Sequence, residues 1–571
     1  MAFGIILNAG GLTGSKSRTL GAHKIAHVLR QYYNEDVRVI DFCEVITLSE
    51  IVTIMNKVVD KDTKFFGIST QWFNNDLTIR GGLVGVSDKL EQQIKKLAKT
   101  QIGKHADEKV SEHFSHPPEH MCGDLMVLEN GLLRELCAYA KHLNPNIKVL
   151  AGGARGNTLE HEDYIDHIFT LFSETQIMDF FDKEVYQKNR FINHDTRAWN
   201  GSHGYKFTKD FVQFTDKDFI TPGESIPIEL ARGCRFRCSY CNYPFIGDKN
   251  MTQYIIEHDS LENYFRHNYD VFGTTKYIVT DDTFNDSTEK LEHYVQVAKK
   301  LPFRLHLWAY TRADVFAKNP EMARLLLELG IYEGYFGIET FTHKTGKAIG
   351  KGMDPEKIKQ ILRDIKKEWQ NDAFTNVALI MGLPYEGYEE LDQNLIPFLF
   401  EDNCPIDELN LHQLMISSKT ISERYPHGEW SVLDKDYEKW GYSFEYEVNP
   451  PNDLEQRVRD PFWHDIGNTN GAYAWRKKDG SSIECFEDTY EAKDYVNEAW
   501  IAAGNTREDG ILPFVSPMKH STDNPHYQDW DKFRGMSKPD QIKYQMGVNR
   551  ITTNNTLEIR KNYVEPLLAS L

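Results

Sequence analysis

The chain has 571 residues, 40% of them hydrophobic, and a chain of this length is expected to divide into two or three domains. Acidic residues outnumber basic ones by 85 to 66, and the formal net charge of −19 argues against broad binding to nucleic acid, which depends on many Lys and Arg contacts to phosphate. No apolar run of about 18 residues occurs, and the first residues lack the pattern of a signal peptide, so we expect a cytoplasmic protein without a membrane span.

The first 185 residues alternate short apolar runs, typical of buried strands, with amphipathic stretches of helical period. The predicted strands are 3–8, 37–42, 64–70, 147–153 and 167–171, and the predicted helices are 17–33, 48–59, 125–143 and 174–183. Short apolar strands that alternate with helices predict a parallel sheet covered on both faces. We therefore expect a doubly wound, Rossmann-like α/β domain over residues 1–185, with an insertion at 71–122.

A second series of strands and helices begins after a predicted linker at 186–224, which contains few apolar runs. Its predicted strands are 226–230, 276–280, 303–310, 332–338, 374–381 and 408–415, and helical stretches such as 288–300, 320–330 and 355–369 lie between them. Six strand–helix units joined by right-handed crossovers form three quarters of an eight-fold barrel. We expect a partial (β/α)6 barrel over residues 225–425, with its functional groups at the carboxyl ends of the strands.

The remaining residues, 426–571, are rich in Trp, Tyr, Asp and Asn and contain six of the ten tryptophans. They show no clear alternation of strands and helices. We expect an irregular or α+β region here, related to substrate binding.

Three of the eight cysteines lie together in the loop that follows the first strand of the second series. Cys234, Cys238 and Cys241 have the spacing C-x3-C-x2-C, and three thiolates on one short loop can bind three corners of a four-iron four-sulfur cluster, leaving its fourth iron open. A structural zinc site is the alternative, but no His lies within fifteen residues of this loop. The other five cysteines are far apart and are predicted to be small buried side chains: Cys43, Cys122, Cys137, Cys404 and Cys485.

With this loop after the first strand of a partial barrel, residues 225–425 resemble the radical S-adenosylmethionine (SAM) enzymes. The resemblance implies that the three cysteines bind a 4Fe-4S cluster and that SAM chelates its open iron. It also implies a set of SAM contacts, carried by the motifs CSYC, TDDTFN, YTRAD, GIET and MGLP: Tyr240 against adenine, Asp282, Arg312 on the carboxylate, Glu339 on ribose or the methionyl amine, and Gly382, Leu383 and Pro384 beside adenine.

The chemistry that the resemblance implies is reductive cleavage of SAM to methionine and a 5′-deoxyadenosyl radical, which abstracts a hydrogen from the substrate. The cofactor carries this chemistry, while the protein provides position, dryness and redox tuning. An electron donor such as flavodoxin or ferredoxin is the expected partner. No further catalytic residue and no substrate follow from the resemblance.

The supporting residues also have structural interpretations. Asp281 and Asp282 could cap the helix that begins near Ser287, because Asp is favoured at helix starts. Arg312 and Glu339 could form an ion pair across neighbouring strand ends. The SAM interpretation depends on the order of these residues along successive strands more than on any one of them.

The first domain resembles the cobalamin-binding domain of the cobalamin-dependent radical SAM enzymes, through its position before the barrel, its FGIST strand and its AGG turn. The resemblance implies cobalamin contacts at Asn8, Ser69, Gly152 and Gly153. The motif D-x-H-x-x-G, in which a His replaces the lower ligand of cobalamin, is absent, and the insertion at 71–122 interrupts the pattern. A degenerate domain that only supports the barrel therefore remains an alternative.

The function expected from these observations is a cobalamin-dependent methyltransferase acting on an unreactive carbon. The first alternative is a radical SAM enzyme without cobalamin, which performs a cyclisation, a rearrangement or another hydrogen abstraction. The second is a non-enzymatic iron–sulfur protein for electron transfer or regulation, in which the SAM motifs would have no use.

Overall fold

The computed structural model describes residues 2–8, 17–43, 46, 48–70, 132–153, 163–169, 172–183, 191–192, 200–241, 255–416, 431–448, 472–503 and 558–571. The chain divides into two compact units. The first comprises Met1–Pro227, His267–Thr274 and Gly535–Leu571, and the second comprises Ile228–Arg266 and Thr275–Arg534. The expected insertion at 71–122 and the predicted position of Cys122 lie outside the described residues.

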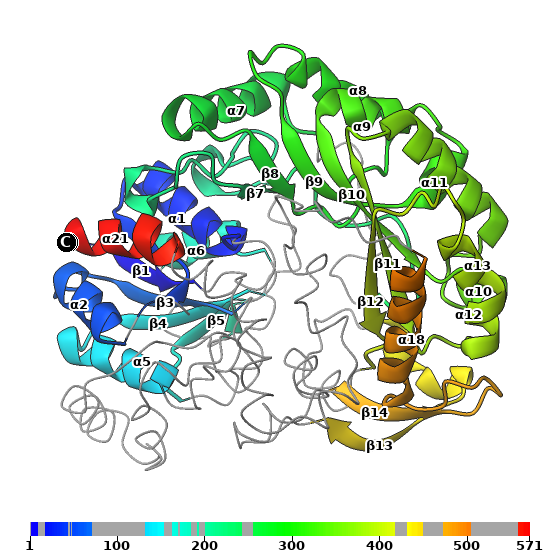
Figure 1. Ribbon diagram of the computed structural model, residues 1–571. Helices are drawn as coiled ribbons and strands as arrows, with labels where there is room; N and C mark the ends of the chain where they lie inside the picture. Colours follow the sequence, from blue (N-terminus) through cyan, green and yellow to red (C-terminus); the bar gives the residue numbers. More distant parts are fainter. Residues whose placement is uncertain are drawn as a thin grey trace. The chain divides into compact units, whose positions relative to one another are not determined.

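A six-stranded sheet in the order β2-β1-β3-β4-β5-β6 forms the centre of the first unit (Figure 1). All of its neighbouring strands are parallel. The strands are β1 (Gly4–Leu7), β2 (Val37–Ile40), β3 (Phe65–Ser69), β4 (Lys148–Gly152), β5 (His167–Phe169) and β6 (Phe191–Ile192). The helices are α1 (Leu20–Tyr33), α2 (Leu48–Val58), α5 (Leu132–Leu143) and α6 (Glu174–Lys183). The five predicted strands are confirmed, and β6 is an additional strand.

Helices cover both faces of this sheet, as the apolar pattern of its strands requires. Met55 of α2 and Leu136 of α5 belong to the hydrophobic core on one face. Ala26 of α1 and Met178 of α6 belong to the core on the other face. The order of the strands reverses beside β1, which is the place where ligands bind in open sheets of this kind.

Two segments differ from the predicted domain boundaries. Residues 200–224, expected as a linker, contain the short 3-10 helices η5 (Ser202–Gly204) and η6 (Asp216–Asp218) and contribute buried side chains to the first unit. The chain also returns to this unit at its end, through η10 (Arg560–Val564) and α21 (Glu565–Ala569). Arg560 pairs with Glu50 of α2 at 2.6 Å, so residues 558–571 do not belong to a separate C-terminal region.

The second sheet has six strands in the order β12-β11-β10-β9-β8-β7, which is the order of the chain (Figure 1). Its strands are β7 (Ile226–Ile228), β8 (Lys276–Val279), β9 (His306–Thr311), β10 (Ile331–Glu339), β11 (Phe374–Met381) and β12 (Glu408–Gln413). The helical segments are α7 (His258–Phe272), α8 (Thr288–Ala298), η7 (Ala313–Ala317), α9 (Met322–Leu329), α10 (His343–Ala348), α11 (Pro355–Trp369), α12 (Tyr388–Asn394) and α13 (Ile396–Leu399). All six predicted strands are present.

The two faces of the second sheet differ. A Cβ atom added at Gly334 of β10 would lie 2.7 Å from the Trp369 ring of α11, so even-numbered residues of this part of β10 face the helices. Because side chains alternate along a strand, Glu333 and Tyr335 lie on the opposite face. We call this opposite face, which carries Tyr335, the inner face.

The described part of residues 426–503 contains α15 (Val432–Lys435), η8 (Tyr437–Trp440), the antiparallel pair β13 (Tyr442–Val448) and β14 (Ala472–Lys477), and α18 (Asp488–Ala502). Helix α18 packs beside β12 and β11. The predicted α+β character is thus present in the part of this region that belongs to the second unit.

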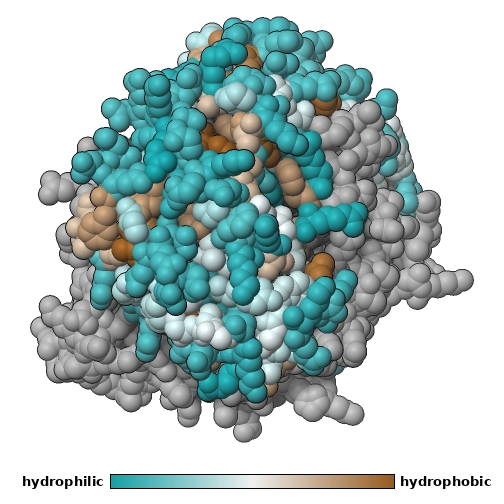
Figure 2. All heavy atoms as spheres, turned by 90° about the vertical axis from the view of Figure 1, so that its right-hand side faces the viewer, coloured by the Kyte–Doolittle hydropathy of each residue, from teal (hydrophilic) through white to brown (hydrophobic). Residues whose placement is uncertain are grey.

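The surface view in Figure 2 shows the face that lies on the right of Figure 1, where α10 to α13 are found. It is mostly hydrophilic, with hydrophobic side chains in small separate patches. Among the helices that the structure describes, none has the length and apolar character needed to cross a membrane. Of the isolated cysteines, Cys43, Cys137 and Cys485 are buried and Cys404 is half-buried.

Candidate active site

The three clustered cysteines lie in the loop after β7, all reduced. Cys238 is buried, whereas Cys234 and Cys241 are partly accessible. The amide of Cys241 donates to the carbonyl of Cys238 at 3.2 Å, which closes a tight turn between them. The thiol of Cys234 lies 3.3 Å from the hydroxyl of Thr283, which follows β8. The loop therefore brings the sulfur of Cys234 beside the residues that follow β8.

The backbone of the cysteine loop is fixed by the residues after α10. The amide of Ser239 donates to the carbonyl of Ile349 at 3.0 Å. Gly350 has a φ of +80°, and a Cβ added there would lie 3.1 Å from the carbonyl oxygen of Arg237. The glycine thus permits both the left-handed backbone and the close approach of the two loops.

Arg312 lies at the end of β9 and contacts the thiol of Cys238, to which its Nη1 donates at 3.0 Å. Its Nε and Nη2 atoms donate to the two carboxylate oxygens of Asp314 at 2.9 and 2.6 Å. The guanidinium carbon also lies 3.9 Å from the ring centroid of Phe236. Burial disfavours the charged form of Arg312, but Asp314 and then Cys238 outweigh burial and raise its pKa. The cation is therefore held in place beside a cysteine sulfur.

Glu339 ends β10 with a φ of +70°, an uncommon backbone conformation for a residue with a side chain. Its Oε1 atom accepts from the hydroxyl of Tyr240 at 2.7 Å and from Nζ of Lys351 at 2.9 Å. Lys351 also donates to the carbonyl of Gly337, where an added Cβ would lie 2.6 Å from Oε1 of Glu339. Burial and then Glu339 raise the pKa of Tyr240. Two residues predicted from separate motifs are thus in direct contact.

The two aspartates after β8 have different positions. Asp281 is buried, and its Oδ1 accepts from the amides of Leu230 and Ala231 at 2.7 and 2.9 Å. Helix α8 is capped by Ser287 instead, so the capping role considered for Asp281 and Asp282 is wrong. Asp282 is half-buried, and its contact with SAM remains a prediction.

The segment 382–384 after β11 is buried and held by its carbonyl groups. In order, these carbonyls accept from Tyr442 Oη at 2.7 Å, Lys477 Nζ at 2.9 Å and Thr345 Oγ1 at 2.8 Å. A Cβ added at Gly382, whose φ is +90°, would lie 2.6 Å from the ring of Trp475. The segment is therefore shaped by β13 and β14, and its contact with adenine remains a prediction.

Glu386 connects the loops after β10 and β11. Its Oε1 accepts from the hydroxyl groups of Thr340 and Thr342. Burial raises the pKa of Glu386 to about 7, although the two hydroxyl groups oppose the shift. This carboxyl group joins the segment after Glu339 to the segment after 382–384.

Four residues of this site were not predicted from the sequence: Lys351, Asp314, Phe236 and Glu386. Lys351, Asp314 and Phe236 contact predicted residues, whereas Glu386 contacts Thr340 and Thr342, and no periodic pattern marks any of the four. Asp314 stands two residues after Arg312 in YTRAD, and this short spacing between opposite charges is the one signal that could have identified a member of the set. The ion pair considered between Arg312 and Glu339 is absent from the described contacts, because Asp314 and Lys351 pair with them instead.

The residues predicted to contact cobalamin lie at the carboxyl ends of the first sheet. Ser69 and Gly152 are neighbours in the register of β3 and β4, and the amide of Thr70 donates to the carbonyl of Gly152 at 2.8 Å. Gly153 has a φ of +112°, which favours glycine. Asn8 follows β1 and is fully buried.

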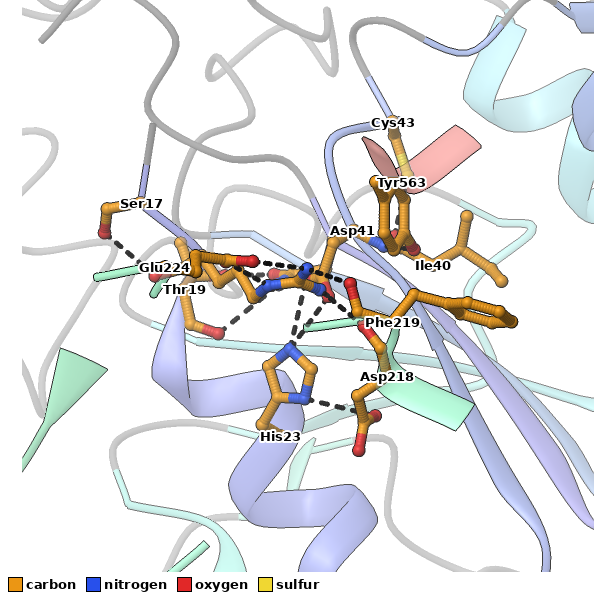
Figure 3. A network of polar contacts seen from close by, with 12 residues as sticks. Ser17, Thr19, His23, Ile40, Asp41, Cys43, Asp218, Phe219, Glu224 and Tyr563 are labelled. Atoms are coloured by element: carbon orange, nitrogen blue, oxygen red, sulfur yellow. Dashed lines mark hydrogen bonds and ion pairs between the residues drawn. The ribbon is translucent and has the colours of Figure 1, made fainter. Parts of the chain in front are cut away.

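Asn8 belongs to a charged network at the ends of β1 and β2, shown in Figure 3. Its amide nitrogen donates to Oδ1 of Asp41 at 2.6 Å. Arg18 donates to Oδ2 of Asp41 at 2.5 Å and to Oε1 of Glu224 at 2.6 Å. His23 lies 3.0 Å from Asp41 through Nε2 (Figure 3). The side chain of Asn8 therefore connects the end of β1 to Asp41 at the end of β2.

The network also holds two segments that are distant in the sequence. Arg18 donates to the backbone carbonyls of Asp218 and Phe219 at 2.9 and 3.0 Å. The hydroxyl of Tyr563 accepts from the amide of Asp41 at 2.7 Å, and its ring lies 4.9 Å from the guanidinium carbon of Arg18. The expected linker and the chain end are thereby fixed to the first sheet.

The cysteine loop fits the demands of an iron–sulfur cluster. Each thiolate of such a cluster binds its own iron, and hydrogen bonds to the sulfur atoms tune the cluster. The contact of Arg312 with Cys238 supplies a donor of this kind. In the described part of the chain, no three His, Cys, Asp or Glu side chains are grouped closely enough to bind one metal ion.

Comparison with known families adds a decisive observation. Residues 228–395 match the model of the radical SAM superfamily. The chain contains a radical SAM domain. The matched range includes the three cysteines, Tyr240, Arg312 and Glu339, and the domain is one that uses a 4Fe-4S cluster and SAM. The resemblance inferred from the motifs is therefore confirmed.

Two curated relatives are methyltransferases. An uncharacterized methyltransferase of Pyrococcus horikoshii is 27% identical over 168 residues, which cover 29% of this chain and 35% of the relative. The bacteriochlorophyllide d C-8(2)-methyltransferase of Chlorobaculum tepidum is 25% identical over 155 residues, which cover 26% of this chain and 34% of the relative. The chain thus spans about a third of the length of the curated relatives it matches.

Solved structures share the fold of the chain. The radical SAM methyltransferase TsrM from Kitasatospora setae, with cobalamin and a [4Fe-4S] cluster bound, has a TM-score of 0.54 and 13% identity, and the match covers 97% of this chain and 99% of TsrM. The cobalamin-dependent radical enzyme OxsB, with aqua-cobalamin bound, has a TM-score of 0.51 and 12% identity, covering 100% of this chain and 81% of OxsB. The α/β fold with parallel sheets is thus shared with enzymes of the cobalamin-dependent subgroup.

Proposed function

We propose that this protein is a cobalamin-dependent type of radical SAM methyltransferase that acts on an unreactive carbon, with a Rossmann-like first domain and a partial barrel formed by the second sheet. One observation carries the radical SAM part of the proposal. Residues predicted from separate motifs are brought together by the fold: Arg312 contacts Cys238, and Glu339 contacts Tyr240.

The roles of the residues follow from their contacts. Cys234, Cys238 and Cys241 would bind the cluster. Arg312 has five N–H donors, of which three are engaged by Cys238 and Asp314 in the described structure, and the remaining two, on Nη1 and Nη2, would bind a carboxylate such as that of SAM. Glu339 is oriented by Lys351 to accept from the SAM ribose or amine.

The bound cofactors supply the difficult chemistry: the cluster and SAM provide a 5′-deoxyadenosyl radical, and cobalamin carries the methyl group. The protein contributes orientation and charge. Tyr240, which belongs to the cysteine loop, would border adenine, as would Gly382, Leu383 and Pro384, while Asp282 would complete the SAM site. An electron donor such as flavodoxin or ferredoxin would be the partner, and a cytoplasmic location would keep the cluster reduced.

Cobalamin binding is supported by the space beside β4. A Cβ added at Gly152 would meet Phe169 at 3.7 Å, an ordinary contact, so the protein itself does not require glycine at this position. A ligand that lies across the strand ends would explain why a residue without a side chain stands at Gly152. We propose that the corrin lies over Ser69, Gly152 and Gly153. Asn8 contributes indirectly, by its hydrogen bond to Asp41.

The second candidate is a radical SAM enzyme without cobalamin. The observation that favours it is the closed network at the ends of β1 and β2, which uses the side chain of Asn8 for structure. The absence of the motif D-x-H-x-x-G agrees with either candidate, because cobalamin can bind without a lower His ligand.

The test is reconstitution of the anaerobically purified protein with hydroxocobalamin, followed by desalting and analysis of SAM products. The proposal expects about one equivalent of retained cobalamin and the formation of both S-adenosylhomocysteine and 5′-deoxyadenosine. Gly152→Leu should lose cobalamin, because the side chain would occupy the corrin position. Gly21→Leu is the matched control, since an added Cβ at Gly21 meets nothing within 4 Å. Cobalamin retention by neither the wild type nor the control, with 5′-deoxyadenosine as the sole nucleoside product, would support the second candidate.

A further inference from the structure

Three aromatic side chains form a cluster on the inner face of the second sheet. The ring centroids of Trp308 and Tyr310 of β9 lie 4.6 Å apart. Tyr335 of β10 completes the cluster, with its centroid 5.6 Å from that of Trp308 and 5.2 Å from that of Tyr310. The rings meet at steep angles, so they present edges and faces in several directions.

This cluster is partly accessible, because Tyr310 is exposed and Tyr335 is half-buried while Trp308 is buried. Tyr310 is 38% exposed, although burial raises its pKa, so its ring faces an accessible but partly enclosed environment. The hydroxyl of Tyr335 lies 2.8 Å from Nε2 of His412 on β12, which is exposed. The cluster is thus bordered by a polar pair on its accessible side.

The indole N–H of Trp308 is a buried donor without an acceptor in the described part of the chain, which suggests that a ligand binds beside it. Trp308 is 5% exposed, and among the residues that the structure describes none accepts a hydrogen bond from its Nε1. A buried donor without an acceptor costs free energy, and buried Trp N–H groups usually find a partner. An acceptor atom on a bound molecule would satisfy it.

The cluster lies on the same face as the proposed SAM residues. Tyr310 and Arg312 are two positions apart on and just after β9, which places them on one face about 7 Å apart along the strand. Tyr335 and Glu339 share the inner face of β10, about 13 Å apart in an ideal strand, with one irregularity between Gly337 and Glu339. A molecule on the aromatic cluster would therefore be adjacent to the residues proposed to orient SAM.

We propose that Trp308, Tyr310 and Tyr335 form the substrate site of this enzyme, and that the site takes a flat ring that carries a hydrogen-bond acceptor at its edge. The inference deepens the proposed function and rests on it. The ring packs against Tyr310 and Tyr335, and the acceptor receives the N–H of Trp308. The site selects against saturated rings, which cannot match the flat faces, and against rings without an acceptor, which leave the indole donor unpaired.

Three probes separate these two requirements. Acetophenone has a flat ring and a carbonyl acceptor, ethylbenzene has the ring without an acceptor, and cyclohexyl methyl ketone has the acceptor without a flat ring. Each is titrated into the intact protein and followed by saturation-transfer NMR. The wild type should bind acetophenone the most tightly of the three.

Trp308→Phe is the decisive variant, because it keeps an aromatic ring while removing the N–H donor together with the five-membered ring of the indole, and the comparison with ethylbenzene separates the two losses. It should weaken acetophenone binding by about fivefold to tenfold and change ethylbenzene binding by less than about twofold. Tyr310→Leu should weaken both aromatic probes and leave cyclohexyl methyl ketone unchanged. Phe400→Leu, at an exposed aromatic residue after α13, is the control and should change none of them.

The same titrations can contradict the proposed substrate site. Equal affinity of the wild type for the three probes, or no binding of acetophenone, contradicts the site. Equal weakening of acetophenone and ethylbenzene by Trp308→Phe contradicts the role of the indole donor. The indole N–H of Trp308 donates no hydrogen bond in the described structure, so this variant should fold, and a cooperative thermal unfolding curve verifies that it does.

A failure of the proposed function is distinguished by SAM cleavage. Phe400→Leu should form 5′-deoxyadenosine at the wild-type rate in the absence of substrate, because Phe400 is an exposed residue outside the proposed substrate and SAM sites. A wild type that forms no 5′-deoxyadenosine contradicts the proposed function, whatever the probes show. A wild type that cleaves SAM but binds the probes without preference contradicts the substrate site alone.

Discussion

Charged side chains follow the strands of both sheets, but their partners differ. At the end of β2, Asp41 is fully buried and its partners are Arg18, His23 and Asn8, all from the same unit. At the end of β9, Arg312 has a cysteine sulfur among its partners. Position at the carboxyl end of a parallel strand therefore predicts where a polar group lies, while its partners decide whether it is available to a ligand.

The largest effect that sharpens this comparison is expected at the cysteines. Replacing Cys234, Cys238 and Cys241 by Ala should abolish cluster binding, because the thiolates are the covalent anchors of the cluster. Iron and sulfide analysis and the visible spectrum of the anaerobic protein measure the loss. Full iron and sulfide content in the triple variant would contradict the assignment. Circular dichroism should show that the first unit remains folded.

Substitutions in the charged network of the first unit should lower the stability of the protein and should not change ligand binding. Arg18→Met leaves the buried Asp41 and the half-buried Glu224 without their guanidinium partner and should lower the free energy of unfolding by about 3–5 kcal/mol. Arg38→Met is the matched control, because Arg38 pairs with Asp36 at a partly exposed site of β2 and should cost at most about 1 kcal/mol. Urea unfolding measures both. Equal losses would show that the buried network has no special role.

The same network predicts a pH dependence. Burial alone would lower the pKa of His23, but Asp41 and Asp218 outweigh it and raise the pKa to about 9 in the folded state. Because the folded value lies above the unfolded value of about 6.5, the stabilising contribution of His23 is present below pH 6.5 and is lost as the pH rises through 9. The contribution should be about 3 kcal/mol at low pH, from the shift between the two values.

Unfolding experiments at pH 6 and pH 9.5 check this prediction. His23→Gln should be less stable than the wild type at the lower pH, and the difference should shrink at the higher pH. A difference that grows with pH would reverse the sign of the linkage. His203→Gln is the control, because His203 pairs with Asp182 at an exposed site.

A smaller effect is expected at Arg312, and it concerns the second sheet. Arg312→Ala removes a charge-assisted contact of about 1.5–3 kcal/mol, so SAM affinity should fall by about tenfold to a hundredfold while the cluster spectrum stays nearly unchanged. Arg312→Lys should recover part of the affinity, since it restores the charge without the planar fork. Equilibrium binding of SAM to the reconstituted protein measures both. Unchanged affinity in Arg312→Ala would assign the residue a structural role.

The candidate site was partly predictable because its motifs are short and ordered. The cysteine spacing, Tyr240 and the strand-end residues Arg312 and Glu339 follow from local sequence, and the structure brings them into contact. Lys351 was not predictable, because its role depends on the absence of a side chain at Gly337, which leaves space for its contact with Glu339.

The amino-acid sequence by itself determined the strands of both sheets except β6, several of the helices between them and the cysteine loop, because periodicity and spacing depend on near neighbours in the chain. The tertiary structure alone decided which charges became partners. Asp41 and Tyr563 are 522 positions apart, and Arg18 and Glu224 are 206 positions apart. No local pattern marks such pairs, because burial of one charged group selects its partner from whichever segments the fold brings to the same place.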